Sequence, residues 1–251
     1  MRRAWSTLQR RDGLKQILIV LGALWAYELA RMLIHPNWSA AMANAQKIDN
    51  LEKGLNFAWE QSVQRAFLSF PELVEAMNVF YFVGHFVLTG IFFLWLYHRS
   101  RDGFRSFRNG FLAATAIAVL IHWQFPTAPP RLLGIGIEDT VRALWNIDIG
   151  SPHASAISNP VAAVPSLHAG WAVGVGIGII RYARQMWLRV LGALYPIAVM
   201  LTIIVTGNHF IFDALAGAAV LAVGFMVANL SRIRRPPWAI MDATPRGGAV
   251  R

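Results

Sequence analysis

Long apolar runs separated by short polar segments decide what this chain can fold into. Of its 251 residues, 56% are hydrophobic and only 14% are charged, a balance too apolar for an ordinary soluble protein. A run of about 20 apolar residues crosses a bilayer as a helix, which satisfies its own backbone hydrogen bonds. We therefore predict an all-α, polytopic membrane bundle of six transmembrane helices. The predicted spans are residues 14–34, 72–97, 109–125, 166–180, 190–205 and 209–230.

The basic residues predict how this bundle is oriented. Of the 23 Lys and Arg residues, 17 lie on the side of the spans that includes both chain ends, and 5 lie in loops on the other side. The positive-inside rule then places both termini in the cytoplasm. The net charge of +10 is thereby explained by the lipid bilayer as partner and does not call for nucleic acid. Nearly all of these residues are arginine, which fits a bacterial protein of the cell membrane. The sequence contains no signal for an oligomeric state.

Composition divides the chain into a cytoplasmic N-terminal segment (1–13), a six-span membrane domain (14–231) and a cytoplasmic tail (232–251) that we expect to be disordered. The first external loop contains apolar residues at helical spacing: Leu51, Leu55, Trp59, Val63, Ala66, Phe67 and Phe70. They predict an amphipathic helix over about residues 47–70 that lies on the membrane surface. Its polar face includes Glu52, Glu60 and Gln64. This helix either guides a lipid head group or simply packs on the bundle.

A short polar stretch between the last two apolar runs contains nearly all of the polar chemistry there. Gly207-Asn208 predicts a break between two helices, after which His209 and Asp213 follow at i and i+4 on one helical face. An unpaired carboxylate is costly in a membrane helix, so we expect Asp213 to pair with His209. A carboxylate that holds one imidazole nitrogen leaves the other free as a base or nucleophile. A purely structural His–Asp pair is the alternative interpretation.

Two further segments have the character of an anion site. Ser166 is a good N-cap for the fourth span, and the free amides around Leu167 and His168 then point outward as hydrogen-bond donors. Arg131 follows the prolines of segment 126–130, which hold it in a stiff turn. An arginine together with a helix N-terminus is a phosphate-binding combination.

The predicted topology brings these groups to one membrane surface, on the extracytoplasmic side. A histidine backed by aspartate, a second histidine able to protonate a leaving oxygen, and an anion site together predict phosphoryl transfer on a lipid head group at the outer leaflet. Further candidates to line this pocket are Tyr81, His85, His122, Thr206 and Asn208.

Two other interpretations fit the same residues. His168, His209 and Asp213 are also a possible set of metal ligands, although the arginine and the helix N-terminus call for an anion. A non-catalytic lipid transporter, flippase or lipid-binding membrane protein would carry the same groups in a pocket without turnover. Substrate binding without turnover would distinguish that class from an enzyme.

These motifs resemble a known family. Pro165-Ser166-Leu167-His168, and His209 followed by Asp213, resemble the second and third motifs of the type 2 phosphatidic acid phosphatase superfamily, and Pro130-Arg131 resembles the end of its first motif. The resemblance implies that His209 attacks phosphorus and forms a phosphohistidine, that Asp213 orients it, and that His168 protonates the leaving alcohol. Arg131, Ser166 and the backbone at Leu167 would hold phosphate oxygens. The substrate would be a membrane lipid phosphate, with no metal and no cofactor.

The sequence departs from the family pattern at several positions. Gln124 stands where the first motif has a lysine, Thr202 and Ile203 stand where the third motif has Ser-Arg, and Leu167 replaces a common glycine. These departures resemble the branch that contains inositol phosphorylceramide synthases, which transfer a phospho-head group. That resemblance implies transfer to an alcohol such as inositol as an alternative to hydrolysis.

Overall fold

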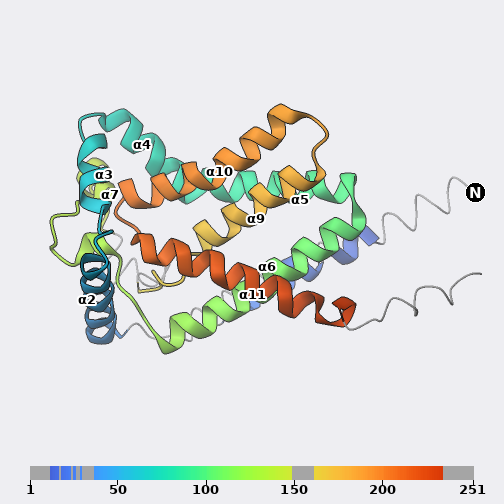
Figure 1. Ribbon diagram of the computed structural model, residues 1–251, viewed down its shortest axis with the longest axis horizontal. Helices are drawn as coiled ribbons and strands as arrows, with labels where there is room; N and C mark the ends of the chain where they lie inside the picture. The colour runs from blue at the N-terminus through green and yellow to red at the C-terminus, as the bar shows by residue number, and fades with distance from the viewer. Residues whose placement is uncertain are drawn as a thin grey trace, which may run out of the picture.

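In the part of the chain that the structure describes, long helices run side by side and form a bundle (Figure 1). The computed structural model describes residues 12–16, 18–23, 25–26, 29, 37–148 and 161–233. Its helices are α2 (Trp38–Gly54), α3 (Glu60–Phe67), α4 (Pro71–Val79), α5 (His85–Arg99), α6 (Arg101–Gln124), α7 (Thr140–Trp145), α9 (Leu167–Tyr182), α10 (Met186–Val205) and α11 (Ile211–Ile233). A π-helical turn, η1 (Phe80–Gly84), joins α4 to α5, and a short 3₁₀ turn, η2 (Pro130–Leu132), precedes α7. The described residues contain no strand beyond an isolated bridge between Thr127 and Ala162, so the predicted all-α class is confirmed.

Helix α9 is the centre of the bundle, because it contacts α5, α6, α10 and α11. Aromatic side chains fill the half of the bundle that contains the arginine-rich loops, where Phe92, Phe107 and Phe111 pack with Leu221. The opposite end contains the first turns of α9 and α11 and the last turn of α10. There α9 and α11 approach each other closely at two glycines, Gly170 and Gly217.

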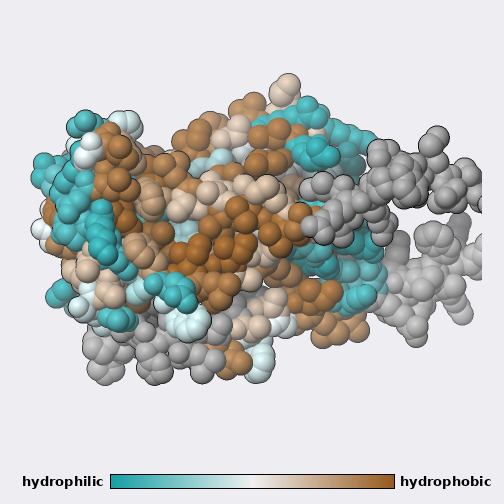
Figure 2. All heavy atoms as spheres, turned by 60° about the horizontal axis from the view of Figure 1, so that its bottom comes forward, coloured by the Kyte–Doolittle hydropathy of each residue, from teal (hydrophilic) through white to brown (hydrophobic). Residues whose placement is uncertain are grey.

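Among the described residues, four helices are long and apolar enough to cross a membrane: Pro71–Arg99, Arg101–Gln124, Met186–Val205 and Ile211–Leu230. They correspond to four of the predicted spans. Helix α9 has 16 residues, about 24 Å at 1.5 Å per residue, which is shorter than the ~30 Å hydrocarbon core. The first predicted span, 14–34, is described only in part, since residues 17, 24, 27, 28 and 30–34 lie outside the described residues, so the predicted count of six is not confirmed. Figure 2 shows apolar side chains gathered across the middle of the molecule, with hydrophilic ones toward its ends.

The predicted spans 72–97 and 109–125 leave residues 98–108 as an internal loop, and the structure shows that this loop is much shorter. Helix α5 ends at Arg99, Ser100 alone separates the two helices, and α6 already begins at Arg101. The hydroxyl of Ser100 accepts a hydrogen bond from the backbone N–H of Gly103, 3.1 Å away, and so caps α6. Arginine side chains are tolerated in such a first turn because their long stems carry the charge out to water.

The single amphipathic helix predicted over residues 47–70 is also wrong, since α2 and α3 are two helices. Their connection contains Asn56 at φ 58°, a left-handed conformation that ends the helix. Helix α2 lies across the end of the bundle, with α3 and α7 beside it (Figure 1). The polar residues Glu52, Glu60 and Gln64 are buried, whereas Leu51, Leu55 and Trp59 are exposed. In this segment three polar side chains therefore pack against the protein, while three large apolar ones point outward.

Other predictions lie mostly outside the described residues. These are the cytoplasmic N-terminal segment 1–13, of which residues 12 and 13 are described, and the tail 232–251, of which the backbone of residues 232 and 233 is described.

Candidate active site

His209 and Asp213 form the pair that their spacing predicts. Nδ1 of His209 lies 3.2 Å from Oδ2 of Asp213, which also accepts the backbone N–H of Phe210 at 3.0 Å. Both side chains are buried, and Oδ1 of Asp213 has no hydrogen-bond partner. Because the carboxylate contacts Nδ1, Nε2 is the ring nitrogen that faces away from Asp213.

The loop that carries His209 is held by its own backbone. Helix α10 ends at Val205, and the carbonyl of Ile203 then accepts the amides of both Asn208 and His209. Gly207 has φ 67°, and a Cβ at this position would lie 2.9 Å from the carbonyl oxygen of Glu138. A glycine is therefore required here on two grounds, conformation and space.

The first turns of α9 and α11 are joined directly. The amide of Ser166 donates to the carbonyl of Asp213 at 2.9 Å, and the helices touch through two glycines. A Cβ at Gly217 would lie 2.1 Å from the carbonyl oxygen of Ser166, and one at Gly170 would lie 2.7 Å from the carbonyl oxygen of Gly217. This contact brings residues that are far apart in the sequence to one place in the bundle.

His168 is brought next to His209 by this contact. Their ring centroids are 6.2 Å apart, close enough for one phosphate to touch both rings. The ring of Tyr81, from η1, stacks on His168 with centroids 4.2 Å apart and lies 6.3 Å from His209. Nε2 of His168 lies 3.2 Å from the carbonyl oxygen of Tyr81. Tyr81 and His168 are both partly exposed, so they form the open side of this site.

The N-terminus of α9 has the predicted geometry. Ser166 is its N-cap, and its hydroxyl accepts from the amide of Ala169 at 3.4 Å. The amides of Leu167 and His168 belong to the first turn, where no acceptor is present within the helix. The positive end of the helix dipole therefore lies beside the two histidines.

Arg131 lies against the loop that carries His209. Its guanidinium donates to Oδ1 of Asn208 and pairs with Asp139 at 3.2 Å, and its backbone amide donates to the carbonyl of Gly207. Hydrogen bonds also anchor the preceding segment: Thr127 N–H donates to Val161, and the carbonyl of Pro126 accepts from the side chain of Asn44. The side chain of Arg131 is only 5% exposed.

The other predicted pocket residues make hydrogen bonds to neighbouring protein groups. His122 lies 3.2 Å from the carbonyl oxygen of Pro165, and Nδ1 of His85 lies 2.9 Å from the hydroxyl of Tyr195. Thr206 accepts from the side-chain amide of Asn208 at 2.7 Å, and the same asparagine accepts from Arg131. Their hydrogen bonds are thus made to the protein framework.

Three residues of the site were not singled out from the sequence as functional. Glu60 accepts from the amide of Ile211 at 2.9 Å, and Glu52 accepts from the amide of Phe212 at 2.7 Å. Gln64 contacts the last carbonyl of α10, at Val205. Burial, and next the neighbouring Glu60 carboxyl, raise the pKa of Glu52 to about 9. A polar helix face in the sequence does not reveal that it is buried, so no local signal marked these residues.

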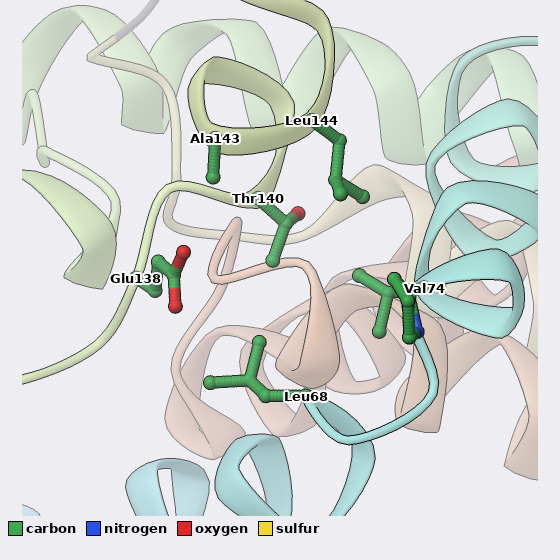
Figure 3. Close-up of a pocket in the computed structure, with 7 residues that line it drawn as sticks. Leu68, Val74, Glu138, Thr140, Ala143 and Leu144 are labelled. Carbon is green, nitrogen blue, oxygen red and sulfur yellow. The ribbon is translucent and has the colours of Figure 1, made fainter.

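A separate small pocket lies outside this cluster (Figure 3). It encloses about 100 Å³ and is lined by Leu68, Pro71, Val74, Glu138, Thr140, Ala143 and Leu144. None of the histidines described above lines it. Among the described residues, no group of three His, Cys, Asp or Glu is arranged to hold a metal ion, so the alternative interpretation of a metal site has no support in this geometry.

A His–Asp pair, a second histidine, a helix N-terminus and an arginine at one end of a helical membrane bundle are groups that can bind and attack a phosphate. The model of the PAP2 superfamily matches residues 46–227, well over half of the chain. The chain therefore belongs to the PAP2 superfamily, the type 2 phosphatidic acid phosphatases, and this membership supports a phosphatase-type activity on lipid phosphates. No curated protein and no solved structure matches it. The inositol phosphorylceramide synthase-like branch is not confirmed.

Proposed function

We propose that this protein cleaves a phosphorylated lipid head group at the outer leaflet through a phosphohistidine on His209. The observation that carries the proposal is the meeting of His168 with the His209–Asp213 pair at one end of the bundle. The arginine-rich connections between α5 and α6 and between α9 and α10 lie at the opposite end. With the positive-inside rule, this arrangement supports an extracytoplasmic site.

In the first step, Nε2 of His209 attacks phosphorus while the bond from phosphorus to the lipid oxygen breaks. Asp213 holds the proton on Nδ1 and stabilises the positive charge that develops on the ring. His168 donates a proton to the departing lipid oxygen. The phosphate oxygens are held by Arg131 and by the amides at the start of α9.

In the second step, a water or alcohol oxygen attacks the phosphohistidine, its proton passes to His168, and the phosphorus–nitrogen bond to His209 breaks. Water gives hydrolysis, and an alcohol such as inositol gives head-group transfer. Few cations lie at the family's cationic positions, since Thr202 and Ile203 are buried uncharged residues and Gln124 is exposed. A phosphodiester carries less charge than a monoester and needs fewer cationic partners, which favours transfer.

The test is to trap the intermediate. Purified protein is mixed with lipid phosphates and lipid phosphodiesters labelled in the phosphate, quenched in alkali and digested, and the labelled peptide is identified by mass spectrometry. We expect an acid-labile label on His209 and no label in His209→Ala. The control is His98→Ala, in the last turn of α5 at the opposite end of the bundle, which should be labelled fully. Labelling that persists in His209→Ala would exclude the proposed nucleophile.

The leaving-group role of His168 has its own test. A p-nitrophenolate leaving group needs no proton, whereas a lipid alkoxide does. We therefore expect His168→Ala to lose far more turnover on a lipid phosphate than on p-nitrophenyl phosphate. Equal losses on both substrates would contradict the assigned role. Adding inositol to the same assay separates hydrolysis from transfer, because only transfer yields a phosphorylated alcohol.

A further inference from the structure

Three buried side chains from α2 and α3 make hydrogen bonds to the backbone at both ends of the loop that carries His209. They are Glu52, Glu60 and Gln64, which we call the α2–α3 clamp. All three are nearly inaccessible, with exposures of 0%, 3% and 1%. Polar side chains of this kind are rarely buried without a specific partner. Each has a partner in the two helix ends that flank the loop, and Gln64 also exchanges two hydrogen bonds with the backbone of Glu138.

Glu60 and Gln64 are one turn apart on α3 and hold opposite sides of the loop. The amide of Gln64 donates to the carbonyl of Val205, at the end of α10, at 2.9 Å. The carboxyl of Glu60 accepts the N–H of Ile211, at the start of α11, at 2.9 Å. A donor therefore meets the helix end that exposes carbonyls, and an acceptor meets the end that exposes amides.

Glu52 extends the same contact from α2. It accepts the N–H of Phe212 at 2.7 Å, next to the amide that Glu60 holds. The N–H of Phe210 is bonded to Asp213. Three consecutive amides at the start of α11 thus donate to three carboxyl groups, and the third of these carboxyls is the partner of His209. The position of Asp213 depends on how this turn is held.

We propose that Glu52, Glu60 and Gln64 are positioning residues, which hold the first turn of α11 and the end of α10 so that Asp213 and His209 keep the geometry of attack. The inference rests on the proposed function for its catalytic consequence. The contacts themselves do not depend on it. Glu52 and Glu60 act through backbone amides and touch neither substrate nor His209.

This role has a specific chemical signature. Glutamine preserves an oxygen acceptor of the same length, whereas methionine preserves the shape and removes the acceptor. A side chain needed only to fill space would be replaced equally well by either. A side chain needed as an acceptor is replaced by glutamine alone.

The experiment compares Glu60→Met with Glu60→Gln, and Glu52→Met with Glu52→Gln, in the full-length protein in lipid vesicles. Because a lost buried hydrogen bond misplaces the nucleophile, we expect the Met variants to lose about tenfold or more in kcat, with KM within about threefold of the original value. The Gln variants should regain most of that turnover. Glu72→Met, at an exposed glutamate in the first turn of α4, is the matched control and should behave as the unmodified protein.

Hydrogen exchange of the segment 205–213 supplies a readout that does not need turnover. We expect the exchange rate of this segment to rise about tenfold or more in the Met variants and to stay near that of the unmodified protein in the Gln variants. Values of kcat are divided by the folded fraction of each variant, so a variant that folds poorly is still measured. Gln64→Met repeats the test from the other side of the loop. Unchanged exchange and unchanged kcat in all three Met variants would overturn the inference. An absence of turnover in the unmodified protein, with the exchange pattern as expected, would overturn the proposed function and leave the clamp standing.

Discussion

Replacing Asp213 with asparagine is the sharpest test of the pair at the centre of the site. The carboxylate accepts two hydrogen bonds, from His209 at 3.2 Å and from the amide of Phe210 at 3.0 Å, in a fully buried position. Hydrogen bonds to charged groups contribute about 1.5–3 kcal/mol each, so the two together are worth roughly 3–6 kcal/mol. At about 1.4 kcal/mol per tenfold, loss of this stabilisation in the transition state lowers kcat by about two to four decades. The amide oxygen of asparagine retains one acceptor, which favours the lower part of that range.

The assay is rapid-quench measurement of phosphohistidine formation alongside steady-state kcat and KM. We expect Asp213→Asn to slow formation of the intermediate while KM changes little, because the residue does not touch the substrate. The matched control is Asp102→Asn, at a carboxylate that is 86% exposed at the opposite end of the bundle. If Asp213→Asn forms the intermediate at the original rate, the carboxylate does not activate His209 and the reasoning fails.

Three further predictions follow from particular contacts. In Gly217→Ala the new methyl group would lie 2.1 Å from the carbonyl oxygen of Ser166. We therefore expect a loss of about 1–3 kcal/mol in stability, measured by thermal unfolding, and a lower kcat. The control is Gly90→Ala, where nothing lies within 4 Å of the new methyl group. Arg131→Lys removes the planar fork that contacts the loop, so KM for a lipid phosphate should rise about tenfold, and an unchanged KM would contradict its role in binding. The pKa of Glu52 is raised in the folded state, so the stability it contributes is complete below its ordinary pKa and is lost as pH rises toward about 9. The melting temperature of Glu52→Gln should therefore rise relative to that of the unmodified protein as pH rises through this window, and a constant difference would show that burial and the neighbouring Glu60 carboxyl do not raise the pKa of Glu52.

Local patterns in the sequence were sufficient for the helices and for the pairs within them. His209 and Asp213 meet because residues four apart lie on one face of a helix. Ser166 caps α9 because a serine ahead of an apolar run satisfies an amide of the first turn. Both inferences involve neighbours along the chain, and both geometries are confirmed.

The orientation of the segment 47–70 could not be inferred in the same way. Leu51, Leu55 and Trp59 have the spacing of a buried face, yet they are exposed, and Glu52 and Glu60 are buried. In a protein surrounded by lipid, apolar side chains have a favourable place outside the fold, so hydrophobicity alone does not tell the inner face from the outer one. The partners of Glu52 and Glu60 settle the matter, and they lie 160 and 151 residues away in the sequence.

From the sequence alone came the α-helical membrane architecture, four of the apolar spans, and the residue types capable of phosphate chemistry, since each depends on composition or on spacing over a few residues. The tertiary structure decided that α9 and α11 touch through Gly170 and Gly217, that Arg131 reaches Asn208, and that α3 holds both ends of the loop between α10 and α11. These contacts join segments that are far apart in the chain. They depend on which helix surfaces fit each other in space, and no periodicity within a single segment contains that information.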